Sequence, residues 1–254
     1  MGDRFRLVRT GPGDAFFNMG LDEAILESVS RGESPPTLRT YSWMPRAITL
    51  GYFQGIEEEV DREACEAAGV DITRRITGGG AVFHDDEVTY SIILPEGSPL
   101  SPPSIIESYG LICSGIMAGL GFLGVEARFA PINDIVSGGK KVSGNAQTRK
   151  RGCLLQHGTL LLSVDPERMF SLLRVPKEKS IGRLTEEIEA RVSSVSRILG
   201  RTVAFKEAEV ALVRGFSEAL GIELVPGSPS CAELMRAQEL AKEKFGSEEW
   251  KRRR

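Results

Sequence analysis

Cysteine, long apolar runs and net charge are all scarce in this sequence. The four cysteines stand apart from one another without a CxxC pair, at Cys65, Cys113, Cys153 and Cys231. Their spacing argues against a structural zinc site and against a disulfide framework. The apolar runs are interrupted before the ~18 residues that a membrane span needs, and the opening MGDRFRLVRT has no apolar segment of a secretory signal. We therefore expect a protein of the reducing cytoplasm with no membrane partner.

The charge balance excludes a further class of partner. The formal net charge is −3 over 254 residues, so the overall electrostatics do not indicate a nucleic-acid-binding protein. Basic residues gather only locally, at Arg149–Arg151 and Lys251–Arg254, and we interpret these as solvated surface charge. With 41% hydrophobic residues and no internal repeat, the chain can form one large globular domain.

The order of predicted elements indicates the fold class. Helices are expected from Asn18, as the N-cap, to Gly32, over the acidic stretch 57–70 and from Pro102 to Gly124. Strands are expected on both sides of the Met44-Pro45 turn and of the glycine loop, and two more flank a turn at Gly138-Gly139. After Pro166 the pattern is mostly helical. Because strict βαβ alternation is absent, we predict an α+β fold with a mixed or antiparallel sheet flanked by helices.

The stretch RRITGGGAVFHD, from Arg74 to Asp85, is the first candidate site. It matches neither the GxxxxGK[ST] phosphate loop nor GxGxxG at the start of a helix, because a β-rich segment follows it. Glycines allow the backbone to approach an anion closely, and Arg74 and Arg75 would add contacts to a phosphate or carboxylate. The alternative is a glycine-rich turn shaped only by packing.

A second cluster, PINDIVSGGKKVSGNAQ, spans residues 131–147. Since side chains alternate along a strand, only one of Lys140 and Lys141 should point into a cleft on a given side. Asp134 could hold Mg²⁺, which prefers one or two carboxylates together with phosphate oxygens. By itself the cluster also fits a surface hairpin. The only two histidines, His84 and His157, lie beside the candidate segments, and either could instead have a structural role.

Three motifs in this order, RRITGGGAVFHD, then NDI…GGKKVSGNAQ, then QHGTLLL, resemble the lipoate-protein ligase A family, which is related to biotin ligases and octanoyltransferases. The resemblance runs from NMGLDEAIL and LGYFQ to the terminal EEW. It implies an α+β domain similar to the catalytic core of class II aminoacyl-tRNA synthetases and biotin ligases. It also implies a two-step reaction, in which ATP with Mg²⁺ activates lipoate or octanoate as an acyl-adenylate. The acyl group then passes to a lysine of a lipoyl domain of a 2-oxoacid dehydrogenase or of the glycine-cleavage H protein.

The resemblance also implies roles for individual residues. Lys141, directly before VSG, is similar to the family's essential lysine, which contacts both the carboxylate and the α-phosphate; a fixed cation there would offset the meeting of two anions. Asn133 and Asp134 resemble the pair near the adenylate and the metal, and His157 lies at the edge of the pocket. The ATP-contacting stretch comprises Arg75, Gly80, Ala81, Val82 and Phe83, and the acyl side comprises Gly78 and Gly79.

The main alternative is an octanoyltransferase that moves octanoate from acyl carrier protein through a cysteine thioester. Such an enzyme needs a thiolate in the pocket. One type resembling this family has its cysteine in the region occupied here by ARFAPIND, and another roughly at Pro176-Lys177; neither position is a cysteine. A sensor or scaffold that binds an acyl group is a third interpretation, but it would not need Lys141, Asp134 and the arginine pair.

We divide the chain into a catalytic domain, residues 1–229, and a C-terminal helical tail of the same domain, residues 230–254. The longer ligases that this sequence resembles carry a small additional C-terminal domain that completes the adenylation site. The chain is too short to include it. We therefore expect either a small accessory subunit, as in bipartite ligases, or transfer from preformed adenylate only.

Overall fold

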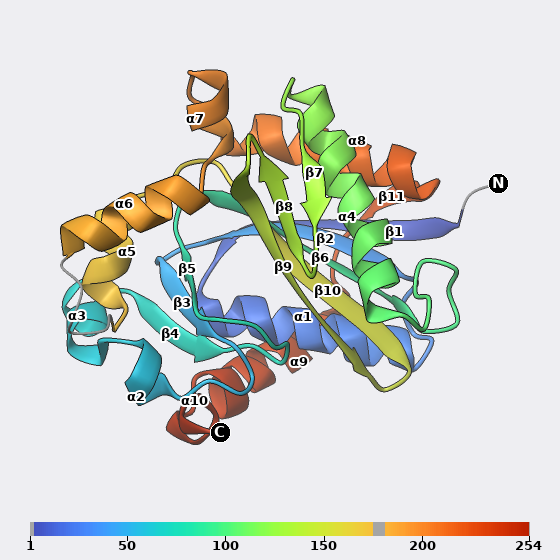
Figure 1. Cartoon of the computed structure of the whole chain (residues 1–254). Coiled ribbons are helices and arrows are strands. Elements are labelled where there is room, and N and C mark those ends of the chain that lie inside the picture. The colour runs from blue at the N-terminus through green and yellow to red at the C-terminus, as the bar shows by residue number, and fades with distance from the viewer. Residues whose placement is uncertain (1–2, 175–180, 254) are drawn as a thin grey trace.

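The computed structural model describes residues 3–174 and 181–253, and its strands form two sheets (Figure 1). The large sheet has the order β11-β1-β2-β6-β10-β9-β8-β7 and the small sheet the order β4-β3-β5. In the large sheet, β1 runs parallel to β2 and to β11, and the remaining pairs are antiparallel, so the predicted mixed sheet is confirmed. The strands are β1 (Arg4–Gly13), β2 (Thr37–Trp43), β3 (Ala47–Leu50), β4 (Asp71–Arg74), β5 (Val82–His84), β6 (Glu87–Pro95), β7 (Arg128–Ala130), β8 (Asp134–Ser137), β9 (Lys140–Lys150), β10 (Cys153–Leu161) and β11 (Glu223–Gly227).

Helices flank the large sheet, and β6 shows why both of its faces are covered. Its side chains alternate, so that Ile92 packs into one apolar cluster and Ile93 into the other. Helices α4 (Ile105–Phe122) and α8 (Phe205–Leu220) contribute to the first cluster, and α1 (Ala15–Ser30) and α9 (Cys231–Leu240) to the second. The other helices are α2 (Ile56–Glu59), α3 (Arg62–Ala67), α5 (Pro166–Leu172), α6 (Ile181–Arg191), α7 (Val195–Leu199), the π-helix η1 (Ala241–Phe245) and α10 (Glu248–Arg252).

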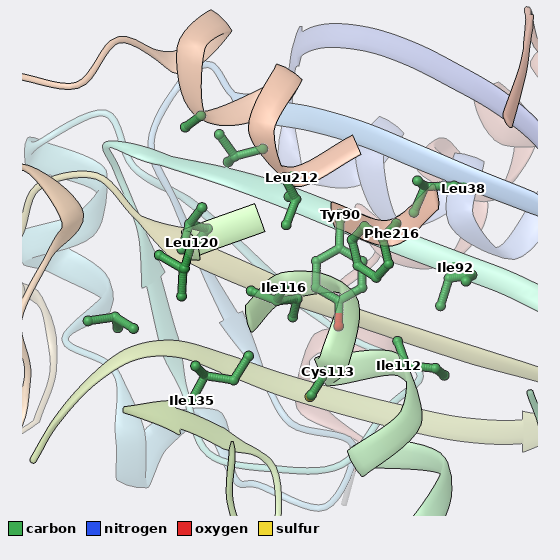
Figure 2. Packing of buried hydrophobic residues seen from close by; sticks show 14 of the residues in the cluster. Leu38, Tyr90, Ile92, Ile112, Cys113, Ile116, Leu120, Ile135, Leu212 and Phe216 are labelled. Carbon is green, nitrogen blue, oxygen red and sulfur yellow. The ribbon is translucent and has the colours of Figure 1, made fainter. Parts of the chain in front are cut away.

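Helices α4 and α8 cross in unusually close contact. A Cβ atom on Gly215 would lie 2.3 Å from the backbone oxygen of Gly115 and 2.3 Å from the backbone nitrogen of Gly119. Next to this crossing, the rings of Tyr90 and Phe216 pack with their centroids 4.9 Å apart (Figure 2). Helix α4 is long and apolar enough, by length and composition alone, to cross a membrane. Its apolar composition is explained by the core that it shares with α8 and the sheet.

Several element boundaries differ from the sequence-based prediction. The N-cap of α1 is Asp14, which accepts a hydrogen bond from the Phe17 amide, and Asn18 lies buried inside the helix. The predicted helix over 57–70 is broken into α2 and α3, because Val60 is extended and pairs with Leu173. The strands on either side of Met44-Pro45 are confirmed, but they belong to different sheets.

Four strands escaped prediction, and the first of them is β1, for which the sequence predicts no element. The stretch from Asp134 to Leu161 contains β8, β9 and β10 rather than two strands, because Arg151 and Gly152 form a second tight turn in the left-handed conformation. Strands β7 and β11 are short edge strands, and β11 contains Pro226, which weakens its β-strand pattern. The predicted turn at Gly138-Gly139 is confirmed, with both residues at positive φ.

The C-terminal segment packs against the start of the chain. Helix α9 lies so close to α1 that a Cβ on Gly20 would come within 2.6 Å of the Ala237 backbone oxygen. Further on, Phe245 and Trp250 are buried in the same cluster as Leu21 and Ile25 of α1. The helical tail therefore covers one face of α1, opposite the face that lies against the sheet.

Candidate functional site

A cavity of about 330 Å³ lies where the two sheets meet. Its walls come from β2 and β6 of the large sheet, from β3 and β5 of the small sheet, and from β9 and β10. The residues predicted as site residues that line it are Arg75, Gly79, Gly80, Ala81, Val82, Phe83, Asn133, Lys141 and His157. Gly78 and Asp134 do not line the cavity, but each contacts a residue that does. The fold thus brings together segments that are more than 60 residues apart in the sequence.

The glycine loop is held in shape by Arg75 from within. One Nη of its buried guanidinium donates to the backbone oxygens of Gly78 and Gly80, both at 2.9 Å, and the other donates to Thr49. Burial lowers the pKa of Arg75 to about 10, and no carboxylate among the described residues offsets this effect. Arg75 therefore presents positive charge behind the loop, where it favours an anion in the cavity.

Arg74 has a different role from the predicted anion contact. Its side chain is fully buried on the far side of the strand and donates to the backbone oxygens of Gly51, Trp250 and Lys251. Alternation along β4 explains the difference, because consecutive side chains leave a strand on opposite faces. Arg74 holds the C-terminal segment in place by hydrogen bonds to its backbone, and the prediction that Arg74 contacts a bound anion is wrong.

The two lysines of the β8–β9 hairpin also separate as expected for a strand. Lys141 lines the cavity, and its Nζ lies 2.7 Å from Asp134 Oδ1. Lys140 points away and donates to the backbone oxygen of Glu189. The ion pair is close, but the approach is poorly directed for a hydrogen bond, so Asp134 Oδ1 is buried without one.

An amide ladder fixes the segment that carries Asp134. Asn145 donates from its backbone nitrogen at 3.1 Å and from Nδ2 at 2.9 Å to the backbone oxygen of Asn133, and Asn133 Nδ2 donates back to the backbone oxygen of Asn145. Tyr90 donates to Asn145 Oδ1 at 2.8 Å. These bonds hold Asn133, and with it Asp134, against β9.

His157 belongs to a buried polar network at the inner end of the cavity. Its Nε2 lies 2.7 Å from Thr77 Oγ1 and its Nδ1 lies 3.4 Å from Asp22 Oδ2, while Asp22 pairs with Arg39 at 2.7 Å. Burial lowers the pKa of His157, which favours the neutral ring. Burial also opposes ionisation of Asp22, but Arg39 and the hydrogen bond with His157 outweigh it and lower the pKa of Asp22.

The order Thr77, His157, Asp22 is that of a nucleophile, a base and an acid. However, Thr77 is fully buried and does not line the cavity. Its hydroxyl also bonds to Arg75 Nε at 3.3 Å. The hydroxyl therefore orients the histidine ring and is not placed to attack a substrate.

An aromatic wall completes the cavity. The Trp43 and His84 rings stack with centroids 4.0 Å apart, and Glu87 binds both, through Trp43 Nε1 at 3.0 Å and His84 Nδ1 at 2.6 Å. Tyr41 and Met19 lie beside them in the lining. Such a wall suits an apolar acyl chain and limits the access of water.

Sequence reasoning missed the aromatic wall and the Asp22 network. Tyr41 and Trp43 follow a strand pattern, in which aromatic residues are expected as core. Asp22 gave a stronger signal, since an acid between Leu21 and Ala24 sits on the apolar side of a predicted helix. A buried acid needs a partner, and its presence could have indicated a polar site.

No cysteine lines the cavity, although all four lie within the described residues. Burial raises the pKa of Cys65 to about 11 and that of Cys113 to about 12, and it also raises the pKa of Cys153. Cys153 is four residues before His157 on β10, about 13 Å along the strand, and packs into the core beneath α1. Cys231 is exposed at the start of α9. The region 127–134 holds no thiol, and Pro176-Lys177 lie outside the described residues.

The sequence model of the lipoyl protein ligase A/B catalytic domain matches residues 14–217, which include the glycine loop, Lys141 and His157. The chain belongs to this family. An octanoyltransferase LipM of Kyrpidia tusciae is 42% identical, covering 98% of this chain and 99% of its own. An octanoyltransferase LipM of Staphylococcus aureus is 33% identical with 98% and 99% coverage.

Solved structures of ligases in this family have the same fold. The bi-partite lipoate protein ligase of Thermoplasma acidophilum, described with its E2 lipoyl domain, superposes with a TM-score of 0.88 at 32% identity, covering 98% of this chain and 96% of its own. A lipoate-protein ligase A bound with ATP gives a TM-score of 0.83 at 31% identity, with 99% and 98% coverage. The predicted membership of the lipoate-protein ligase family and the α+β class are confirmed.

Proposed function

We propose that this protein attaches a lipoyl or octanoyl group, as an amide, to a lysine of a lipoyl carrier domain, and that it uses an acyl-adenylate made from ATP as the donor. Acceptors of this kind are lipoyl domains of 2-oxoacid dehydrogenases and the glycine-cleavage H protein. The family supports the acyl transfer. The observation that carries the choice of donor is the cavity, which offers a lysine and a buried guanidinium but no thiol.

A thioester route would need a cysteine thiolate within reach of the acyl group. The three buried thiols are kept protonated by burial, and Cys231 lies away from the cavity. Activation by ATP instead requires fixed positive charge beside the carboxylate and the phosphates. Lys141 and Arg75, which both line the cavity, would supply that charge.

The proposed reaction has two balanced steps. An oxygen of the acid's carboxylate attacks the α-phosphorus of ATP, the bond to the β-phosphate oxygen breaks, and pyrophosphate leaves. The carrier's lysine, after losing a proton, then attacks the acyl carbon. The carbon–oxygen bond to AMP breaks and the amine gives up a second proton, which yields the amide. The Lys141 ammonium would offset the repulsion in the first step, and the aromatic wall would keep water from the adenylate.

The residues present fit a Mg²⁺ ion that enters with the triphosphate. Among the described residues there is no group of three His, Cys, Asp or Glu that could hold a metal alone. Asp134 offers one carboxylate, which Lys141 contacts through Oδ1, and one carboxylate with substrate phosphates is an arrangement that Mg²⁺ accepts. The ion would supply charge neutralisation beside the phosphates.

A second candidate function is octanoyl transfer from acyl carrier protein without ATP. The names of the curated relatives favour it, since proteins of this similarity and matching length are octanoyltransferases. In that case the thioester of the acyl carrier protein is attacked directly or through an enzyme cysteine. Lys141 would then stabilise the developing oxyanion, and the candidate cysteine would be Cys153.

One experiment separates the two functions. Purified protein is incubated with an apo lipoyl domain and with each of three donors: lipoate or octanoate plus Mg-ATP, synthetic lipoyl-AMP, and octanoyl acyl carrier protein. Intact-mass spectrometry follows both the carrier and the enzyme. We expect acyl-AMP and a carrier mass shift with free acid and ATP, and no thioester on the enzyme.

Transfer from lipoyl-AMP but not from free acid would support the transfer half of the proposal and indicate that adenylation needs an accessory subunit. Transfer only from octanoyl acyl carrier protein, with an enzyme adduct that hydroxylamine releases, would overturn the adenylate route. The variant Cys153→Ala then tests the thiol directly.

A further inference from the structure

Gly144 lies under the contact between Lys141 and Asp134. In the antiparallel β8–β9 ladder, Asp134 is paired with Gly144, and the register shifts next to Lys141 so that Val142 has no partner on β8. A bulge of this kind changes the side on which the next residue projects. Lys141 therefore projects on the same side as Gly144, and its side chain runs back over Gly144 to reach Asp134.

The end of the Lys141 side chain occupies the space that a side chain at residue 144 would fill. A Cβ atom there would lie 2.6 Å from Lys141 Nζ and 2.7 Å from Lys141 Cε, and 3.8 Å from Asp134 Oδ1. No other heavy atom comes nearer than 3.8 Å to this Cβ, and the φ of Gly144 lies outside the left-handed range that demands glycine. Neither backbone conformation nor core packing thus explains a glycine at this position.

We propose that Gly144 is a positioning residue that keeps open the slot in which the Lys141 amine is held for the reaction. The inference rests on the proposed function, because that function gives Lys141 its role. The backbone on both sides is anchored: the Lys141 carbonyl accepts from the Ser193 amide at 2.8 Å, and Asn145 is held by Asn133. An added methyl group therefore displaces the end of the lysine and leaves the strand in place.

The activity test uses Gly144→Ala with Gly97→Ala as the matched control, because Gly97 lies in an exposed loop with nothing within 4 Å of its added Cβ. A displacement of about 1 Å at a reacting group can cost about 100-fold in rate. We expect Gly144→Ala to lower kcat for acyl transfer by about that factor. Its Tm should stay within about 2 °C of that of the wild type, because no backbone atom is displaced.

Two further variants show whether Gly144 acts through the lysine. If it does, Gly144→Ala in a Lys141→Ala background lowers activity no further than Lys141→Ala alone. The proposal would be overturned if the double variant had much lower activity than Lys141→Ala alone. It would also be overturned if Gly144→Ala had the kcat of the wild type.

A labelling experiment tests the slot independently of the reaction. Lys141 must leave its ion pair to react with a small amine-acylating reagent, and a partly exposed pair contributes up to ~1 kcal/mol, or about 5-fold. We expect labelling of Lys141 at fixed pH, followed by peptide mass spectrometry, to be about 2- to 5-fold faster in Gly144→Ala and in Asp134→Asn. Equal labelling in wild type and Gly144→Ala refutes the slot. Faster labelling in an enzyme that modifies no carrier with any donor refutes the proposed function and retains the slot.

Discussion

Lys140 and Lys141 are neighbours in the chain with different surroundings, which makes them a matched pair for mutation. Lys141 lines the cavity beside Asp134, whereas Lys140 binds a backbone carbonyl near the end of α6. We expect Lys141→Ala to lower acyl transfer by about 10²- to 10³-fold, the size typical of losing one preorganised electrostatic contact. Lys140→Ala should stay close to wild type. The measurement is the initial rate of carrier modification, and equal rates for the two variants would remove Lys141 from the mechanism.

At this scale the sequence predicts the site well wherever a residue type is chemically unusual. A glycine run, a lysine pair in a hairpin and rare histidines all lie at or beside the cavity. It fails for roles that depend on which face of a strand a side chain takes. Arg74 and Arg75 are the same residue type at adjacent positions. Arg74 nevertheless donates to the backbone of the C-terminal segment, whereas Arg75 donates to the backbone of the glycine loop.

The crossing of α4 and α8 is the contact between elements that depends most on glycine. A Cβ on Gly215 meets backbone atoms of Gly115 and Gly119 at 2.3 Å, so the helices would have to separate. We expect Gly215→Ala to lower the free energy of unfolding by about 3 kcal/mol, as in overpacked cores. Chemical denaturation measures the loss.

Gly121→Ala, at an exposed position of α4, the other helix of this crossing, is the control. Nothing lies within 4 Å of its added Cβ. Alanine is favoured over glycine inside a helix by about 1 kcal/mol, so this variant should be unchanged or slightly more stable. Similar stability of the two variants would show that the helices can move apart without cost.

Elements with strong periodicity were predictable, and elements defined by their partners were not. Helix α4 and strand β6 follow from apolar patterns that stand out locally. Strand β7 has three residues, and β11 is a strand only because β1 lies beside it. The sorting of β2 and β3 into different sheets likewise arises from tertiary pairing, which no local pattern records.

On the scale of the whole molecule, the buried polar network couples the site to stability. A chain of buried ion-pair and hydrogen-bond contacts links α1, β2 and β10 to the glycine loop. Its members are Arg39, Asp22, His157 and Thr77. Such a network is expensive to leave partly satisfied, because each buried group that loses its partner keeps its desolvation cost. A change of charge within it should therefore affect global unfolding as well as the cavity.

This coupling predicts a pH dependence of stability between about pH 5 and 7. Burial lowers the pKa of His157 below its ordinary 6.5, so the unfolded chain takes up a proton more readily than the folded one. Stability is then complete above 6.5 and falls as the pH drops toward the folded pKa. Asp22, whose pKa lies below 3.8, adds a loss only at lower pH, where other carboxylates also titrate.

Thermal unfolding at pH 5, 6, 7 and 8 at constant ionic strength measures this dependence. We expect the Tm of the wild type to be constant above pH 7 and to fall from pH 6.5 to 5. The variant His157→Gln, which keeps a hydrogen-bonding side chain between Thr77 and Asp22 but cannot titrate, should have a lower and flatter Tm over the same range. If the Tm of both proteins decreases by the same amount between pH 7 and 5, the acid sensitivity arises elsewhere and His157 is not the group that senses pH.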